Sequence, residues 1–132
     1  MSEQIKRALL VDDCEVTRRL IGMALAATGV HEFIVAADGA EAIARLQAEK
    51  VEVVILDRRM SGMDGLECTR RIRAGIDGID PHISIVLLTA VTGAESEREA
   101  YEAGVDLFME KPISIRKIQA GISRIIAGKT QA

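Results

Sequence analysis

The chain has 132 residues, of which 48% are hydrophobic and 28% charged, and its formal net charge at pH 7 is −3. These values fit one globular domain, so residues 1–132 are expected to form a single domain with a core from about 6 to 127. The mildly acidic balance argues against a nucleic-acid-binding surface, and no apolar run approaches the ~20 residues that cross a bilayer.

The predicted elements alternate between short apolar strands and longer segments with a helical period of apolar residues. In chain order they are strand 8–11, helix 14–28, strand 33–36, helix 39–48, strand 51–56, helix 64–73, strand 83–88, helix 94–103, strand 105–109 and helix 114–127. This alternation predicts a doubly wound α/β fold, with a five-stranded parallel sheet covered by five helices. The strands are nearly continuous runs of Val, Ile and Leu, as is typical of strands buried on both faces.

The helices differ in the apolar surface that they offer. The first has five apolar residues on one face, namely Val16, Leu20, Met23, Ala24 and Ala27. The last has a similar face made of Ile115, Ile118, Ile122, Ile125 and Ile126. The segment 94–103 has four glutamates and almost no large apolar residue, so we expect this helix to be held weakly. The third helix ends in arginines that favour its dipole and to which we assign no partner: Arg70, Arg71 and Arg73.

Cysteine and histidine usage points to neither a disulfide framework nor a zinc site. Cys14 and Cys68 form no CxxC pair, so both are expected to be reduced thiols. His31 and His82 are too scattered to bind zinc together. Because the N-terminal segment also lacks the features of a signal peptide, we expect a cytoplasmic protein that binds neither nucleic acid nor membrane.

Polar side chains stand at the ends of four predicted strands. Strand one is followed by Asp12 and Asp13, strand three by Asp57, strand four by Thr89 and strand five by Lys111. The carboxyl ends of strands in an open parallel sheet form its ligand-binding edge. Clustered carboxylates repel one another unless a cation intervenes, and Mg²⁺ binds such oxygens together with phosphate. A strand-end aspartate beside Mg²⁺ is an oxygen nucleophile that could form an acyl phosphate, whose oxygens the hydroxyl and ammonium groups would stabilise.

Each of these residues also has a purely structural interpretation. Asp12 or Asp13 could cap the first helix, Thr89 could end its strand without a partner, and Lys111 could be a surface charge. Asp57 is harder to dismiss, because a carboxylate that closes an apolar strand is destabilising unless it is paired or has a function. The agreement of four strand ends favours a shared site.

Five short motifs resemble the receiver domain of two-component response regulators. They are LLVDD at 9–13, ILD at 55–57, MSGMDG at 60–65, LLTA at 87–90 and EKP at 110–112, in the order and spacing of that family. The resemblance covers about residues 6–126. It implies a flavodoxin-like fold with strand order 2-1-3-4-5, and a phosphoacceptor switch rather than an enzyme.

The resemblance also implies a role for each acidic residue of the site. Asp57 is similar to the phosphoacceptor. Asp12 and Asp13 resemble the acidic pair that positions Mg²⁺ (or Mn²⁺), with Asp13 as the direct ligand and Asp12 acting partly through water. The backbone carbonyl of Arg59 resembles a further metal ligand, beside Asp57 itself.

The remaining matched residues resemble the switch. Thr89 is similar to the hydroxyl that moves toward the phosphoryl group, and Lys111 to the lysine that pairs with it. Phe108 lies where the family places its switch aromatic, although a plain core role is the alternative. The Lys111–Pro112 bond resembles one that is cis in this family.

Departures from the family pattern surround the acceptor. The proline that usually follows the methionine is Ser61, the basic residues Arg58 and Arg59 follow Asp57, and Val91 is apolar. In this family the side chains at the positions of Arg59 and Val91 help to set how fast the phosphoryl group is lost. We expect both to shield an acyl phosphate from water and to give a fairly long-lived phosphorylated state.

The expected function is that of a stand-alone receiver, phosphorylated on Asp57 by a histidine kinase or a histidine phosphotransfer protein and signalling through a downstream protein. The region of Val16, Arg18 and Arg19 resembles the surface that docks the phosphohistidine protein. A receiver segment of a hybrid kinase is a close alternative. An aspartyl-phosphate phosphatase of the haloacid-dehalogenase kind is disfavoured, because its second aspartate is replaced here by Arg59. A dinucleotide-binding enzyme is disfavoured because no glycine-rich turn follows the first strand.

Overall fold

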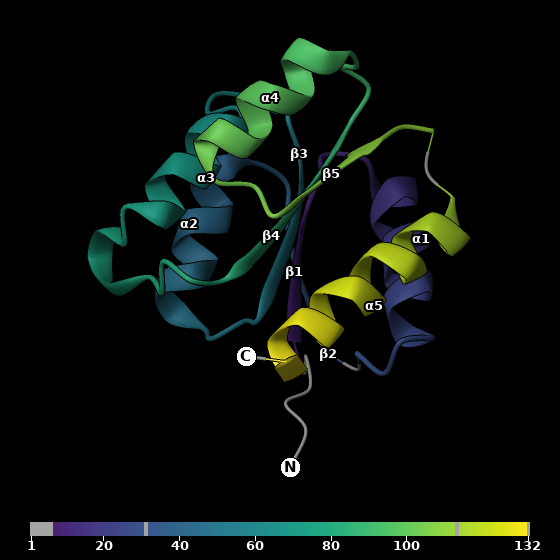
Figure 1. Ribbon diagram of the computed structural model, residues 1–132. Coiled ribbons are helices and arrows are strands. Elements are labelled where there is room, and N and C mark those ends of the chain that lie inside the picture. The colour runs from purple at the N-terminus through teal and green to yellow at the C-terminus, as the bar shows by residue number, and fades with distance from the viewer. Residues whose placement is uncertain (1–6, 31, 113, 132) are drawn as a thin grey trace.

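The computed structural model describes residues 7–30, 32–112 and 114–131, without the side chains of residues 77, 126 and 129–131 (Figure 1). Its elements, in chain order, are β1 (Arg7–Val11), α1 (Glu15–Ala26), β2 (Glu32–Ala36), α2 (Gly39–Ala48), β3 (Val53–Asp57), α3 (Gly65–Arg73), the 3₁₀ helix η1 (Ile76–Gly78), β4 (Ser84–Thr89), α4 (Ala94–Ala103), β5 (Leu107–Glu110) and α5 (Ile115–Gln131).

The strands form one parallel sheet in the order β2-β1-β3-β4-β5, which confirms the predicted fold class. Helices α1 and α5 lie on one side of the sheet, and α2, α3 and α4 lie on the other (Figure 1). The register pairs Asp57 with Leu88, and Thr89 with Glu110. The carboxyl ends of β3, β4 and β5 therefore reach the same edge of the sheet.

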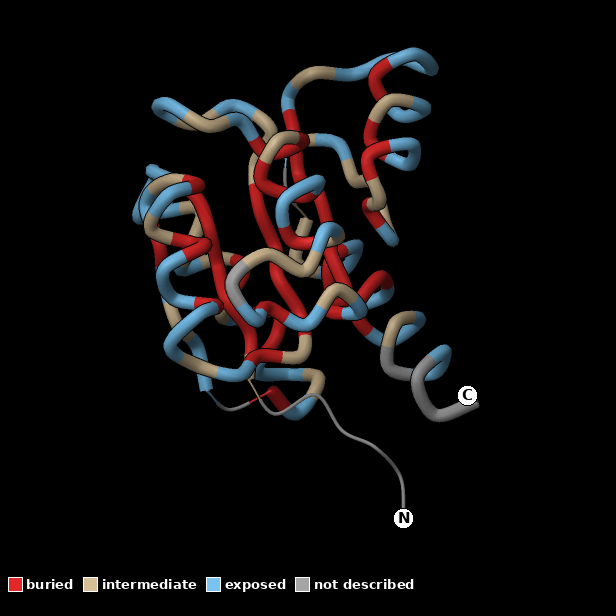
Figure 2. The backbone as a smooth tube through the Cα atoms, turned by 90° about the vertical axis from the view of Figure 1, so that its left-hand side faces the viewer, coloured by how far each residue is buried: buried red, intermediate tan, exposed pale blue. Residues whose placement is uncertain are grey.

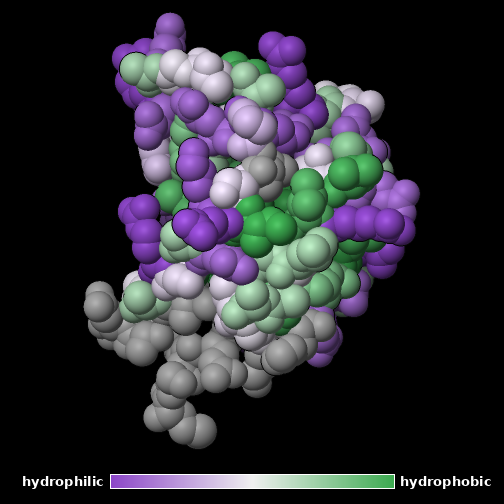
Figure 3. Space-filling view, turned by 90° about the vertical axis from the view of Figure 1, so that its right-hand side faces the viewer, coloured by the Kyte–Doolittle hydropathy of each residue, from purple (hydrophilic) through white to green (hydrophobic). Residues whose placement is uncertain are grey.

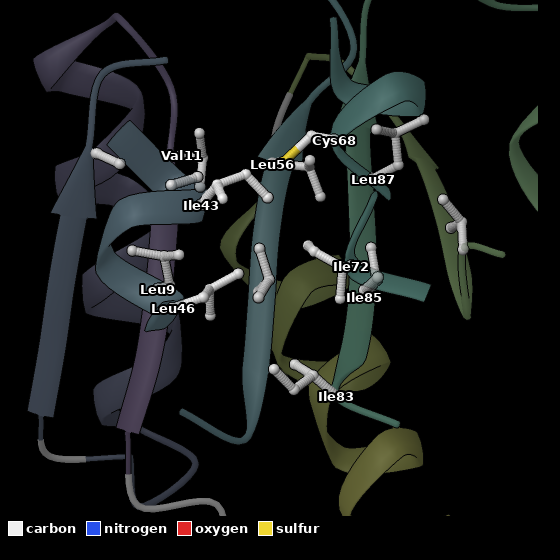
Figure 4. Close-up of a cluster of buried hydrophobic side chains, with 14 of the residues drawn as sticks. Leu9, Val11, Ile43, Leu46, Leu56, Cys68, Ile72, Ile83, Ile85 and Leu87 are labelled. Carbon is white, nitrogen blue, oxygen red and sulfur yellow. The ribbon is translucent and has the colours of Figure 1, made fainter. Parts of the chain in front are cut away.

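Buried apolar side chains fill both sides of the sheet, because successive residues of a strand point to opposite faces. The central strands are buried along most of their length (Figure 2). One cluster lies under α2, α3 and α4 and includes the ten labelled residues of Figure 4: Leu9, Val11, Ile43, Leu46, Leu56, Cys68, Ile72, Ile83, Ile85 and Leu87. A second cluster lies under α1 and α5 and includes Leu10, Leu25, Ile55, Ile118 and Ile122. Because both faces of a central strand are buried, its polar side chains lie at the strand ends.

The predicted apolar face of α1 is only partly buried. Val16 is 65% exposed and Met23 is 61% exposed, whereas the helix buries Ile21, Ala24 and Leu25. Hydrophobic side chains accordingly reach the surface on the side formed by α1 and α5 (Figure 3). The exposed pair Val16 and Met23 and the buried pair Ile21 and Leu25 both fit a helical period. The period alone therefore did not show which pair faces the sheet.

Two further details differ from the sequence prediction. The fifth strand begins at Leu107 instead of residue 105, because Val105 donates its N–H to the carbonyl of Ala100 and completes the end of α4. In β2, Phe33 and Val35 are 39% and 45% exposed, because this strand lies at the edge of the sheet.

Of the predicted α5 face, Ile118 and Ile122 are buried, and the side chain of Ile126 lies outside the described residues.

Helix α4 has the weak apolar anchoring that its sequence predicts. Its buried residues are Ser96, Ala100 and Ala103, all of them small. Among the described residues, no helix has the length and apolar character needed to span a membrane.

Candidate functional site

The site lies at the carboxyl edge of the sheet, where one ammonium group joins two carboxylates. Lys111 Nζ donates to Asp57 Oδ2 at 2.7 Å and to Asp12 Oδ2 at 3.2 Å. The Asp12 side chain is 3% exposed, Asp57 13% and Lys111 21%. The interpretation of Lys111 as a surface charge is therefore wrong, and three strand ends far apart in sequence meet as predicted.

Backbone groups fix the second oxygen of each carboxylate. Asp57 Oδ1 accepts from the N–H of Arg59 at 3.2 Å, and Asp12 Oδ1 accepts from the N–H of Cys14 at 2.9 Å. Each carboxylate thus has one oxygen held by the main chain and one held by Lys111. The loop after β3 is close-packed, since a Cβ on Gly65 would lie 2.3 Å from the carbonyl oxygen of Asp57.

The charge of Lys111 is maintained by its partners. Burial alone lowers the pKa of Lys111, but the hydrogen bonds and charges of Asp57 and Asp12 outweigh burial and raise this pKa above its ordinary value of 10.5. An ammonium group between two carboxylates neutralises charge that would otherwise be unfavourable in a largely buried site.

Thr89 ends β4 at the same edge, whereas Phe108 lies within β5, two residues before its last residue Glu110. Thr89 is fully buried, its Oγ1 accepts from the N–H of Val91 at 2.9 Å, and its carbonyl accepts from the N–H of Lys111 at 2.8 Å. Phe108 is half-buried against the core cluster of α2, α3 and α4, and its N–H donates to the hydroxyl of Tyr101 at 3.1 Å. The peptide bond between Lys111 and Pro112 is cis, as the resemblance implied.

Asp13 and Arg59 are exposed at the rim of the site. Asp13 does not cap α1, because the N-cap residue of this helix is Cys14. The alternative role of Asp13 as the helix cap is therefore wrong.

The carboxylates fit a hard divalent cation in their chemistry. Asp12, Asp13 and Asp57 offer the oxygen ligands that Mg²⁺ and Mn²⁺ prefer. The residues that the structure describes contain no preformed group of three such side chains around one point. In this arrangement the ammonium group of Lys111 supplies the positive charge between Asp12 and Asp57.

Sequence reasoning missed a second set of contacts next to Asp57. Arg58, which directly follows Asp57, has its Nη1 3.2 Å from Ser96 Oγ and its Nη2 3.6 Å from Glu99 Oε1 on α4. These residues are about forty positions apart in the chain, and a serine inside a polar helix has no periodic signal that would have revealed the contact.

The two cysteines differ strongly in accessibility, which allows a direct test of the structure. A hydrogen bond from Thr17 lowers the pKa of the exposed Cys14, whereas burial raises the pKa of Cys68 to about 11. Because the thiolate is the reactive form, we expect iodoacetamide at pH 8 to alkylate Cys14 in the native protein and to leave Cys68 unmodified. Peptide mass spectrometry measures both; equal labelling in urea is the control, and native labelling of Cys68 would contradict the burial described here.

Comparisons with known proteins show the family of the chain. The family model of the response regulator receiver domain matches residues 8–123. Response regulator PleD of Caulobacter vibrioides is 36% identical over 107 residues, which cover 81% of this chain and 23% of PleD. The chain thus spans about a quarter of the length of that relative.

Solved structures share the fold. Chemotaxis response regulator CheY4 of Vibrio cholerae superposes with a TM-score of 0.82 at 28% identity, covering 92% of this chain and 99% of CheY4. The Mn²⁺-bound form of response regulator Rcp1 superposes with a TM-score of 0.78 at 24% identity, covering 92% of this chain and 94% of Rcp1. With the matched family model and the identity to PleD, the chain belongs to the response regulator receiver domains of two-component systems.

Proposed function

We propose that Asp57 accepts a phosphoryl group from the phosphohistidine of a histidine kinase or a histidine phosphotransfer protein. The observation that carries this proposal is the contact of Lys111 Nζ with both Asp57 Oδ2 and Asp12 Oδ2 at the carboxyl edge of the sheet. It places a fixed positive charge beside a carboxylate that has one further hydrogen bond, from the N–H of Arg59. Such an arrangement orients a carboxylate as a nucleophile and prepares for additional negative charge.

In the proposed reaction an oxygen of Asp57 forms a bond to phosphorus while the bond from phosphorus to the histidine nitrogen breaks, and the electron pair of that bond remains on the imidazole. Lys111 stays hydrogen-bonded at the site and offsets the charge of the three phosphoryl oxygens. Thr89, buried at the same edge, supplies a hydroxyl to one of these oxygens.

A divalent cation, Mg²⁺ or Mn²⁺, completes the proposed site. Asp12, Asp13, Asp57 and the carbonyl of Arg59 would hold it, and when bound it neutralises charge on the phosphoryl group. The proposal is supported by the oxygen-rich donor set and by the bound Mn²⁺ of Rcp1.

The proposed signal passes to a partner protein through the face of α4, β5 and α5, with Thr89 and Phe108 as the switch residues.

We further propose that residues 1–132 act as a single receiver domain with a core at about 6–127, working alone in the cytoplasm. The alternative is a receiver segment of a hybrid kinase. The exposed Val16 and Arg19 on α1 support a docking surface for the phosphohistidine protein beside Asp13.

Phosphorylation of Asp57 is tested by incubating the protein with Mg²⁺ and acetyl phosphate and measuring its mass. We expect one added phosphoryl group on the wild type and none on Asp57→Asn. Asp64→Asn is the matched control, because this exposed carboxylate caps α3 and asparagine retains the capping ability. No adduct on the wild type, or an undiminished adduct on Asp57→Asn, would disprove the proposed function.

The lifetime of the phosphorylated state tests the shielding role of Arg59. We expect Arg59→Ala to lose its phosphoryl group about three- to tenfold faster than the wild type, because an exposed long side chain beside Asp57 hinders an attacking water. Decay of the mass adduct after removal of acetyl phosphate gives the rate. Arg70→Ala, an exposed arginine on α3, is the control, and equal or slower decay of Arg59→Ala refutes shielding.

A further inference from the structure

Helix α4 is held by a side chain that begins one residue after the phosphoacceptor. The guanidinium of Arg58, a side chain that is 20% exposed, donates from Nη1 to Ser96 Oγ and lies 3.6 Å from Glu99. Ser96 is itself buried, with 5% exposure, and its Oγ donates to the carbonyl of Val91 at 2.9 Å. Arg58 therefore reaches through Ser96 to the loop that joins β4 to α4.

Polar contacts have unusual weight in holding this helix. The buried residues of α4 are only Ser96, Ala100 and Ala103, so it has little apolar side-chain surface to fix it against the sheet. Two further polar contacts hold its second half: the Tyr101 hydroxyl accepts from the N–H of Phe108, and Arg73 donates to the carbonyl of Gly104 at the C-cap. A helix with such weak anchoring is sensitive to the loss of one polar contact.

Arg58 and Thr89 hold the same loop residue from two sides. Thr89 Oγ1 accepts from the N–H of Val91, while the carbonyl of Val91 accepts from Ser96, which in turn accepts from Arg58. A shift of Thr89 toward a phosphoryl group on Asp57 would pull on Val91 and thus on the Arg58–Ser96 contact. The acceptor strand and the switch strand are in this way both connected to the first turn of α4.

We propose that Arg58 is a positioning residue that holds α4 in the arrangement belonging to unmodified Asp57, so that phosphoryl uptake works against the Arg58–Ser96 contact. This inference rests on the proposed function and concerns the regulation of the same site. A contact made in one state and weakened in the other biases the equilibrium between them, and it lowers the affinity of any ligand that prefers the second state.

The test uses beryllium fluoride, a mimic of a phosphoryl group on a carboxylate, in the presence of Mg²⁺. Isothermal titration calorimetry gives its affinity for the wild type, Arg58→Ala and Ser96→Ala. We expect both variants to bind about three- to tenfold more tightly than the wild type. Removal of the Arg58 charge by itself weakens the attraction of an anion, so a gain in affinity has the opposite sign to a simple electrostatic effect.

Arg98→Ala is the matched control. Arg98 lies on α4 with 66% exposure and pairs with Glu95 of the same helix. Its loss removes a charge from α4 without cutting the link to Arg58, so we expect an affinity within about twofold of the wild type. Ser96→Ala leaves every charge in place and is a small change, which keeps the test valid if Arg58→Ala folds poorly.

A second readout follows α4 itself. The chain has one tyrosine and no tryptophan, so its intrinsic fluorescence comes from Tyr101 on α4. Without beryllium fluoride, we expect the fluorescence intensity of Arg58→Ala to lie closer than that of the unliganded wild type to the intensity of the ligand-bound wild type. If the wild type binds beryllium fluoride and both variants bind equally or more weakly, the role of Arg58 is refuted. If the wild type binds none, the proposed function fails instead.

Discussion

Replacement of Lys111 by alanine is expected to lower the free energy of unfolding at pH 7 by about 2–3 kcal/mol, because it leaves two largely buried carboxylates facing each other without a cation. The carboxylates are those of Asp12 and Asp57, which lie 3.2 and 2.7 Å from Lys111 Nζ. Urea denaturation of both proteins measures the difference. Addition of Mg²⁺ is expected to stabilise the variant more than the wild type, since the cation replaces the lost charge.

The pH dependence of this difference has a defined sign. The folded protein raises the pKa of Lys111 above its ordinary value of 10.5. The contribution of Lys111 to the free energy of unfolding is therefore fully present at neutral pH and is lost as the pH rises through this raised pKa. The stability of wild type and variant should therefore converge at strongly alkaline pH. Lys117→Ala is the control, because Lys117 is an exposed lysine of α5; a Lys111 variant as stable as this control would show that the ion pairs contribute nothing.

Replacement of Arg73 by alanine is expected to cost about 3–4 kcal/mol of stability, because several carbonyl groups and a carboxylate lose a shared donor. Arg73 donates to the carbonyls of Gly104, Pro81 and Ile83 at 2.8, 2.7 and 2.6 Å, and to Asp106 Oδ2 at 2.7 Å. The same Asp106 oxygen accepts from the N–H of Ile85 at the start of β4. One side chain of α3 thus fixes the entries of β4 and β5.

The control is Arg71→Ala on the same helix. Arg71 is 48% exposed and pairs with Glu67 one turn earlier on α3, an arrangement that contributes only about 0.3–0.5 kcal/mol. Equilibrium unfolding in urea should therefore separate the two variants by about 3 kcal/mol. Equal stabilities would contradict the anchoring role of Arg73.

The site was more predictable from sequence than the contacts that hold the helices. Asp12 follows β1, Asp57 ends β3 and Lys111 follows β5, and parallel strands bring such ends together without any knowledge of side-chain positions. The sequence also indicated the strand order through the family resemblance, and the structure confirms it.

The missed contacts have a common physical reason. Arg73 appeared to serve only the dipole of its helix, yet its partner Asp106 lies 33 residues away, and Arg58 is 38 residues from Ser96. Neither spacing leaves a periodic pattern, because each pair depends on how loops place two elements. The prediction of which face of α1 is buried was wrong for a related reason. Val16 and Met23 have the helical period of a core face, but the packing of the helix buries Ile21 and Leu25 instead.

The contact between Lys111 and Asp12 spans 99 positions of the chain, and that between Lys111 and Asp57 spans 54. During synthesis, β1 and β3 exist well before the ribosome has made β5, so Asp57 is present for some time without its ammonium partner. A nascent or prematurely terminated chain that stops before Lys111 therefore has the Asp57 carboxylate without the group that neutralises it. Asp12 and Asp57 therefore gain their shared ammonium partner only after translation has passed β5.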